Sequence, residues 1–145
     1  MEKAPATARE IEFGSGATVA VLVPLPLASA YDYQVPEGVT VALGDFVAVP
    51  LGPRQVNGVV WAAGTGEVAA DRLRDIIGVL DVPPMPLAQR DFLAWVADYT
   101  LASLGAVLKL AMSVPAALAP PKPQTGYAVG SETPSRMTPA RARVL

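Results

Sequence analysis

The stretch that decides the fold is VAVLVPLPLASAYDYQVPEGVTVALGDFVAVPLGPRQVNGVVW, residues 19–61. Short runs of β-branched and aromatic residues alternate in it with turns rich in proline and glycine, which is typical of strands joined by tight connections. We predict strands at residues 17–23, 31–35, 46–49 and 56–62. Gly58 inside the last run indicates a bulge or a close backbone approach. Short strands at this spacing favour a small, bent antiparallel sheet or barrel-like core.

The segments after residue 61 predict a packing partner for this sheet. LRDIIGVLD, residues 73–81, favours one more strand, and a helix is expected from about Leu87, after a run of prolines. Gly105 separates that helix from a second short one at residues 106–113. Large apolar side chains recur along the first helix at helical spacing, which predicts that they are core residues: Phe92, Trp95, Val96 and Tyr99. The expected fold class is α+β, with the helix pair covering one side of the sheet.

Composition excludes most catalytic chemistry. The chain has 145 residues, a formal net charge of −2, and neither cysteine nor histidine. Disulfides, thiolate metal sites, cysteine nucleophiles and histidine-based triads are therefore excluded, and no G-x-x-x-x-G-K-[ST] phosphate-binding loop occurs. We predict no catalytic residue, metal site or cofactor in this chain. The slight negative charge provides no global attraction for nucleic acid, so any DNA contact must be local.

Both ends of the chain differ in composition from its centre. Residues 1–18 are small and polar and are expected to be a disordered lead-in to a domain at residues 19–119. A proline run begins a predicted linker at residues 120–137. Thr138 before Pro139 fits a helix N-cap, so residues 138–145 are expected to begin a further, truncated domain. Because neither a signal peptide nor a spanning segment is evident, the predicted location is the cytoplasm.

The triplet Tyr31-Asp32-Tyr33 is the one cluster of aromatic and acidic residues in the central stretch. In a strand, the two tyrosines share one face and Asp32 lies on the other. Taken alone, the tyrosines are most simply core aromatics and Asp32 a solvated residue. Gly52 between two prolines is most simply a turn residue, and Arg74 is most simply a member of a surface ion pair.

The order of the features resembles one known family. A proline-rich strand end, an aromatic-Asp-Tyr triplet, a Pro-Glu-Gly turn, a V-x-V-P strand, a glycine and a Gly-Val-Val strand follow one another in residues 21–61. The ordered set is similar to the N-terminal domain of the primosomal protein N′ (PriA) family of replication-restart DNA helicases. LRDIIGVLD and FLAWVADYTLASLGAVLKLAMSVP are similar to the family's next segments, and RMTPARARVL to the first helix of its winged-helix domain.

The resemblance implies that this domain binds the 3′ end of a DNA strand at a stalled replication fork. The family's pocket residues correspond to Tyr31, Asp32, Tyr33, Gly52 and Arg74, with Phe and Lys frequent in the family at the first and last of these. A carboxylate can accept a hydrogen bond from a 3′-hydroxyl and would repel a 3′-phosphate. An aromatic ring can stack on the terminal base. A glycine admits close backbone approach, and an arginine can pair with the last internucleotide phosphate.

The resemblance also implies activities that would lie outside this chain. The parent proteins would be ATP-dependent 3′-to-5′ DNA helicases, with ATP, magnesium and structural zinc expected only in the missing helicase part. The expected partners are forked DNA and DNA with a free 3′ end, and primosome and single-strand-binding proteins are further candidates. One alternative of a different class remains open, namely a protein-interaction β-barrel module with no direct role in nucleic-acid binding.

Overall fold

The structure is a computed structural model that describes residues 11–119. The predicted linker, the predicted start of a further domain and the first part of the predicted lead-in lie outside these residues. The strands are β1 (Glu12–Phe13), β2 (Thr18–Leu22), β3 (Tyr31–Gln34), β4 (Val41–Ala42), β5 (Phe46–Leu51), β6 (Arg54–Ala63), β7 (Arg74–Asp75) and β8 (Gly78–Val79). The helices are α1 (Leu87–Thr100), α2 (Leu104–Ala111) and a 3-10 turn, η1 (Pro115–Leu118).

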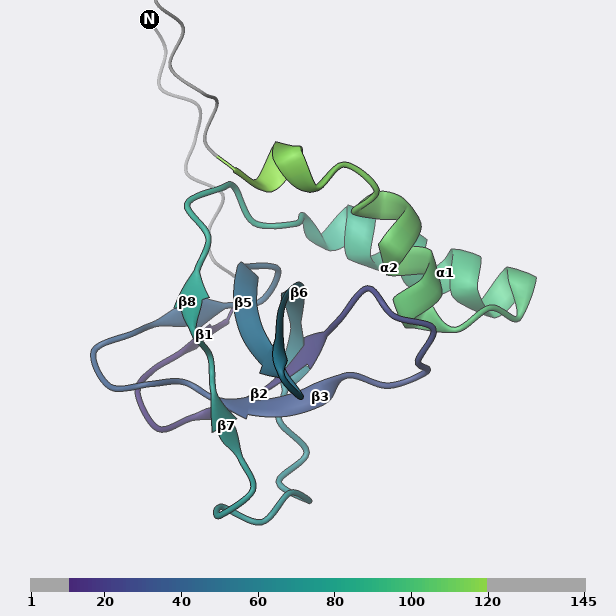
Figure 1. The fold of residues 1–145 in the computed structure, drawn as a ribbon. Coiled ribbons are helices and arrows are strands. Elements are labelled where there is room, and N and C mark those ends of the chain that lie inside the picture. Colours follow the sequence, from purple (N-terminus) through teal and green to yellow (C-terminus); the bar gives the residue numbers. More distant parts are fainter. Residues whose placement is uncertain (1–10, 120–145) are drawn as a thin grey trace, which may run out of the picture.

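The main sheet is curled so far that its two edges meet at one segment (Figure 1). Its six strands lie in the order β7-β3-β2-β6-β5-β8, and β7 and β8 belong to the same short segment, residues 74–79. The N–H of Ile76 donates to the Gln34 carbonyl at one edge, over 3.0 Å, and the N–H of Ile77 donates to the Ala48 carbonyl at the other, over 2.8 Å. The α+β class and the bent sheet are therefore confirmed.

Two details of the predicted sheet differ from the structure. The pairing of β3 with β7 is parallel, so the sheet is mixed and not purely antiparallel. Residues 73–81 form two separate two-residue strands and not one continuous strand. Both differences arise because successive N–H groups in this segment point to opposite edges of the curled sheet. The edge strands β3 and β5 run in opposite directions, so a segment that is antiparallel to β5 must be parallel to β3. The strands predicted within residues 17–62 correspond to β2, β3, β5 and β6.

Alternation along the strands divides the core between the two faces of the sheet. The concave face carries a valine-rich cluster that includes Val19, Val21, Tyr33, Val49 and Val60. The other face carries Leu22 and Val59, which pack against side chains of the two helices and the segment before them: Met85, Leu93, Ala97, Val107 and Leu108. In Figure 1 the helix layer lies on one side of the sheet, as predicted.

The predicted burial of the α1 aromatics is wrong. Phe92, Trp95 and Tyr99 are 59%, 58% and 76% exposed, whereas α1 buries Arg90, Leu93 and Ala97. Both sets follow the same spacing of three and then four residues, so periodicity alone could not separate them. The rotation of the helix is set by packing of Leu93 and Ala97 against α2 and the sheet.

Residues 11–18, which the sequence placed in the lead-in, are part of the fold. β1 pairs antiparallel with β4 through Glu12–Ala42 and Phe13–Val41. The N–H of Leu43 donates to the Ile11 carbonyl over 3.1 Å. Phe13 also packs against the concave core, which gives this short strand an apolar anchor despite its polar neighbours. Within residues 11–119, neither α-helix has the length and apolar character needed to cross a membrane.

Gly105 generates a prediction about the joint between sheet and helices. Its N–H donates to the Leu27 carbonyl over 3.0 Å, and a Cβ at this position would collide with the Leu25 carbonyl oxygen. We expect Gly105→Ala to lower the free energy of unfolding by about 2 kcal/mol, because the backbone after β2 must move. Urea denaturation of the purified chain measures this loss.

Gly78→Ala is the matched control for that substitution. A Cβ at Gly78 meets no atom within 4 Å. The expected change in the free energy of unfolding is within about 0.5 kcal/mol. Similar losses in the two variants would contradict close packing at Gly105.

Candidate functional site

Tyr31, Tyr33 and Arg74 belong to the same face of the curled sheet. β3 pairs with β2 through Tyr31–Val21 and Tyr33–Val19, and both valines lie in the concave core. β7 pairs Tyr33 with Arg74. These three side chains differ in exposure: Tyr33 is buried, Arg74 is exposed and Tyr31 is 41% exposed. One aromatic ring and one cation are therefore accessible beside a buried phenol.

The Tyr33 hydroxyl connects β3 to the β5–β6 hairpin. It donates a hydrogen bond of 2.9 Å to the Pro50 carbonyl oxygen. Two residues later the chain turns at Gly52-Pro53, where Gly52 has a φ of +58° that favours glycine. A Cβ at Gly52 would meet nothing within 4 Å, so open space lies beside its backbone. The tyrosine thus holds the Gly52 turn at the same end of the sheet as Arg74.

Burial favours the neutral form of the Tyr33 phenol. It raises the pKa of Tyr33 above the usual value of 10.0, and the neighbouring Tyr31 raises this pKa further, while the positive charge of Arg74 lowers it in part. A neutral phenol retains the proton that it donates to Pro50. The hydroxyl is therefore a structural donor, and the Tyr31 ring is the more accessible of the two aromatic surfaces.

Asp32 lies on the opposite face of β3, as strand alternation predicts, and it holds the loop after β6. Its Oδ2 accepts hydrogen bonds from the Thr65 N–H at 3.0 Å, the Thr65 hydroxyl at 2.8 Å and the Gly66 N–H at 3.2 Å. Its Oδ1 accepts only a longer contact of 3.2 Å from the Thr65 N–H. The carboxylate is thus fixed in orientation, and Oδ1 retains capacity for another donor.

The structure therefore brings four of the five candidate residues to one side of β3 and leaves Asp32 on the other. The edge of the strand joins the two sides. β7 pairs only with Tyr33 and Gln34, so the outer edge of β3 beside Tyr31 and Asp32 has no strand partner among the described residues. A ligand at this edge can reach the Tyr31 ring from one side and the Asp32 carboxylate from the other.

Two features of this region escaped the sequence analysis. Thr65 and Gly66 fix the carboxylate, although their only signal in the sequence was a polar Gly-Thr-Gly loop after a strand. Arg74, interpreted as a member of a surface ion pair, forms none within residues 11–119. Its neighbour Asp75 pairs with Gln34 and so belongs to the other face. The Arg74 charge is therefore not neutralised by a described acidic side chain.

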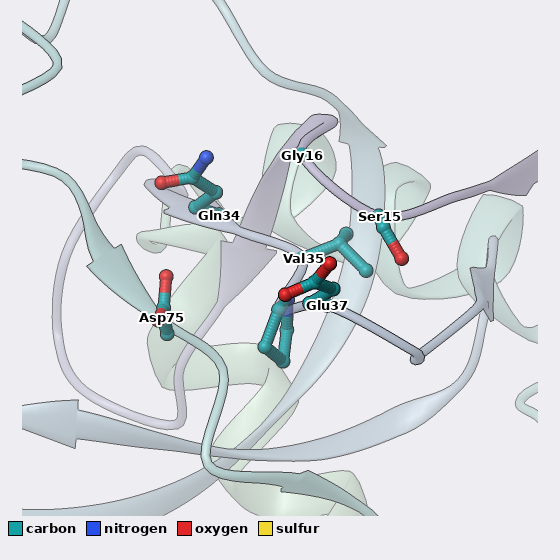
Figure 2. Close-up of a pocket in the computed structure, with 7 residues that line it drawn as sticks. Ser15, Gly16, Gln34, Val35, Glu37 and Asp75 are labelled. Carbon is teal, nitrogen blue, oxygen red and sulfur yellow. The ribbon is translucent and has the colours of Figure 1, made fainter.

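A pocket of about 370 Å³ opens on the Gln34 and Asp75 side of the β3–β7 pair (Figure 2). It is lined by Ser15, Gly16, Gln34, Val35, Pro36, Glu37 and Asp75. None of the five candidate residues lines this pocket. Its two carboxylates and lack of any cation make it unsuited to a phosphate group. The pocket is therefore separate from the candidate site.

Comparison with known proteins decides the family. A family profile described as the PriA 3′ DNA-binding domain matches residues 20–113, which include all five candidate residues. The chain belongs to the PriA 3′ DNA-binding domain family. The family match runs from within β2 to just beyond α2, so the main curled sheet and the helix layer are both parts of the family domain.

Full-length relatives agree with this assignment. Over 99 residues the chain is 38% identical to the replication restart protein PriA of Haemophilus influenzae, an alignment that covers 66% of this chain and 13% of that protein. The Synechocystis protein of the same name is 33% identical over 97 residues, which are 64% of this chain and 12% of that protein. The Rickettsia felis protein of the same name is 27% identical over 106 residues, which are 70% of this chain and 16% of that protein. The chain therefore spans only a small part of the length of each of these relatives.

The Tyr33 hydrogen bond generates a stability prediction with a defined pH dependence. Tyr33→Phe removes the bond to Pro50 and is expected to cost about 1 kcal/mol near pH 7. The folded-state pKa of Tyr33 lies above the unfolded value, so the stability that Tyr33 contributes is complete below about pH 10 and decreases above it. Urea denaturation of both proteins between pH 7 and 11 should show the wild-type advantage shrinking above pH 10. A constant difference across this range would contradict the raised pKa.

Proposed function

We propose that this domain binds the 3′-hydroxyl end of a DNA strand. The observation that carries the proposal is the Asp32 carboxylate, which Thr65 and Gly66 hold on one side of a strand edge whose other side carries the exposed Tyr31 ring. No strand within residues 11–119 pairs with this edge. An oriented carboxylate with acceptor capacity fits a hydroxyl, and its charge disfavours a terminal phosphate. The family match supports DNA as the ligand.

Each of the other candidate residues has a role in this proposal. The Tyr31 ring offers the terminal base a stacking surface, which needs no particular base. Tyr33 supports that surface from within the core and holds the β5–β6 hairpin through Pro50. The open space beside Gly52 lets a nucleotide approach the backbone. Arg74 binds the last internucleotide phosphate, because its guanidinium has no competing described carboxylate.

The biological setting of the proposal comes from the relatives. Their printed names describe replication restart proteins. We propose that the chain supplies such a protein with recognition of a strand end at a stalled fork, in the cytoplasm where bacterial DNA lies. Helicase activity and the ATP, magnesium and zinc that would accompany it remain proposals for the longer relatives.

The decisive test compares oligonucleotides that differ only at their 3′ end. We expect the chain to bind a short single strand with a 3′-hydroxyl more tightly than the same strand with a 3′-phosphate. Asp32→Asn should reduce this preference by about 1.5 kcal/mol, or roughly tenfold, because it removes the charge that selects the hydroxyl. Fluorescence anisotropy with 5′-labelled strands measures both affinities.

Thr65→Val separates recognition by Asp32 from its structural role. This variant loses the 2.8 Å hydroxyl contact but keeps the carboxylate and the backbone donors. It should retain the preference for the 3′-hydroxyl. Equal wild-type affinities for the two strands would exclude end recognition, and loss of the preference in Thr65→Val would assign the effect of Asp32 to loop structure.

A second candidate function, docking of a protein, is favoured by the exposed aromatic row of α1. Phe92, Trp95 and Tyr99 stack along the helix, with ring centroids 6.0 and 5.2 Å apart. Large exposed aromatics of this kind mark protein interfaces more often than solvated surface. Asp91 and Asp98 on the same helix are exposed and disfavour a phosphate backbone. Primosome and single-strand-binding proteins are the partners that we propose for this surface.

The two candidate functions separate experimentally. Trp95→Ala combined with Tyr99→Ala should leave binding of the 3′-hydroxyl strand unchanged within about twofold, because α1 packs on the face of the sheet opposite Tyr33. The same variant should lose capture of purified single-strand-binding or primosome proteins. Loss of DNA binding with intact protein capture would reverse the assignment of the two surfaces.

A further inference from the structure

Arg54 is a charged residue on the concave face that the family correspondence does not include in the site. It opens β6 and pairs with Leu51 across the β5–β6 hairpin. Alternation along β6 puts Arg54 on the same side as Val56 and Val60, and both of these pack in the concave core. Arg54 therefore belongs to the same face of the curled sheet as Tyr33 and Arg74.

The hairpin that carries Arg54 is fixed against β3. The hydrogen bond from Tyr33 ends on the Pro50 carbonyl, and Pro50 pairs with Gln55, the residue after Arg54. Gly52 and Pro53 form a tight connection, so little slack separates Pro50 from Arg54. Arg74 on β7 and Arg54 on β6 therefore both lie at the end of the sheet where the Tyr33 side chain meets the β5–β6 hairpin.

The charge environment of Arg54 favours an anionic ligand. β5 and β6, FVAVPL and RQVNGVVWAA, contain no acidic residue, and Arg54 is their single charge. Its side chain is exposed and forms no ion pair within residues 11–119. An unpaired arginine at the rim of an apolar hairpin can bind a phosphodiester through its planar fork of donors.

We propose that Arg54 binds the second internucleotide phosphate from the 3′ end of the strand. The inference rests on the proposed function, in which Arg74 binds the last internucleotide phosphate. A strand whose terminal base stacks on Tyr31 then runs from β7 along the rim of the concave face toward the β5–β6 hairpin. The two arginines hold successive phosphates, and the site reads at least two nucleotides of backbone without base preference.

The test measures affinity and salt dependence of Arg54→Gln with a 3′-hydroxyl single strand, using the full 145-residue chain. We expect a three- to tenfold loss of affinity, with the slope of log K against log salt reduced by about 0.7, the value for one phosphate contact on a single strand. Lys109→Gln is the matched control, because it removes one exposed positive charge from α2, in the helix layer. It should change the affinity by less than twofold.

Strands with one uncharged methylphosphonate linkage locate the contact. Neutralising the second linkage should weaken binding to the wild type but not to Arg54→Gln, whereas neutralising the first should weaken binding to both. The proposal is overturned if Arg54→Gln behaves like Lys109→Gln, or if the second linkage matters equally in both proteins. A strand with a 3′-phosphate tests the proposed function separately. Equal affinity for the 3′-hydroxyl and 3′-phosphate strands would exclude end recognition, while the methylphosphonate comparison would still decide the role of Arg54.

Discussion

One short segment, residues 74–79, holds the two edges of the sheet together. Consecutive N–H groups of Ile76 and Ile77 donate in opposite directions, to Gln34 on β3 and Ala48 on β5. The same segment buries Ile76 in the concave core and leaves Ile77 exposed. Without this double pairing the sheet would have two open edges, and the Arg74 guanidinium would have no fixed relation to Tyr33. The curl of the sheet and the composition of the candidate site thus depend on the same few backbone hydrogen bonds.

The alternation of β3 gives the site two sides. Tyr31 and Tyr33 belong to the concave face with Arg74, while Asp32 turns outward and binds the loop that follows β6. A flat surface could not present an aromatic ring and an oriented carboxylate to the same nucleotide from two directions. A strand edge can do so, and within residues 11–119 no strand pairs with that edge beside Tyr31 and Asp32. This arrangement is the physical basis of the proposed selection of a strand end over a continuous backbone.

The helix layer gives the domain a second accessible surface, which carries exposed aromatic side chains. α1 and α2 cover Leu22 and Val59 on the face of the sheet opposite the valine-rich core. Close contact at Gly105 brings α2 against the chain after β2. With the smaller residues Leu93 and Ala97 turned inward, α1 presents its large aromatics to solvent. The candidate site and the aromatic row of α1 therefore lie on opposite sides of one small domain.

The sequence alone determined the local structure and the family. Turn residues and β-branched runs located β2, β3, β5 and β6, a proline-rich segment located the start of α1, and the ordered motifs identified the family that the comparison confirmed. These signals are short-range, since they depend on backbone preferences and on alternation within one element.

Only the tertiary structure decided those features that depend on contacts between segments distant in the sequence. The pairing of residues 74–79 with both sheet edges, the capture of Asp32 by Thr65 and Gly66, and the place of Arg54 on the concave face are all contacts of this kind. The rotation of α1 belongs with them, because two stripes of equal periodicity compete for the interior and only packing against the sheet and α2 selects one. A sequence records which side chains share a face, but the closure of the sheet determines which faces meet.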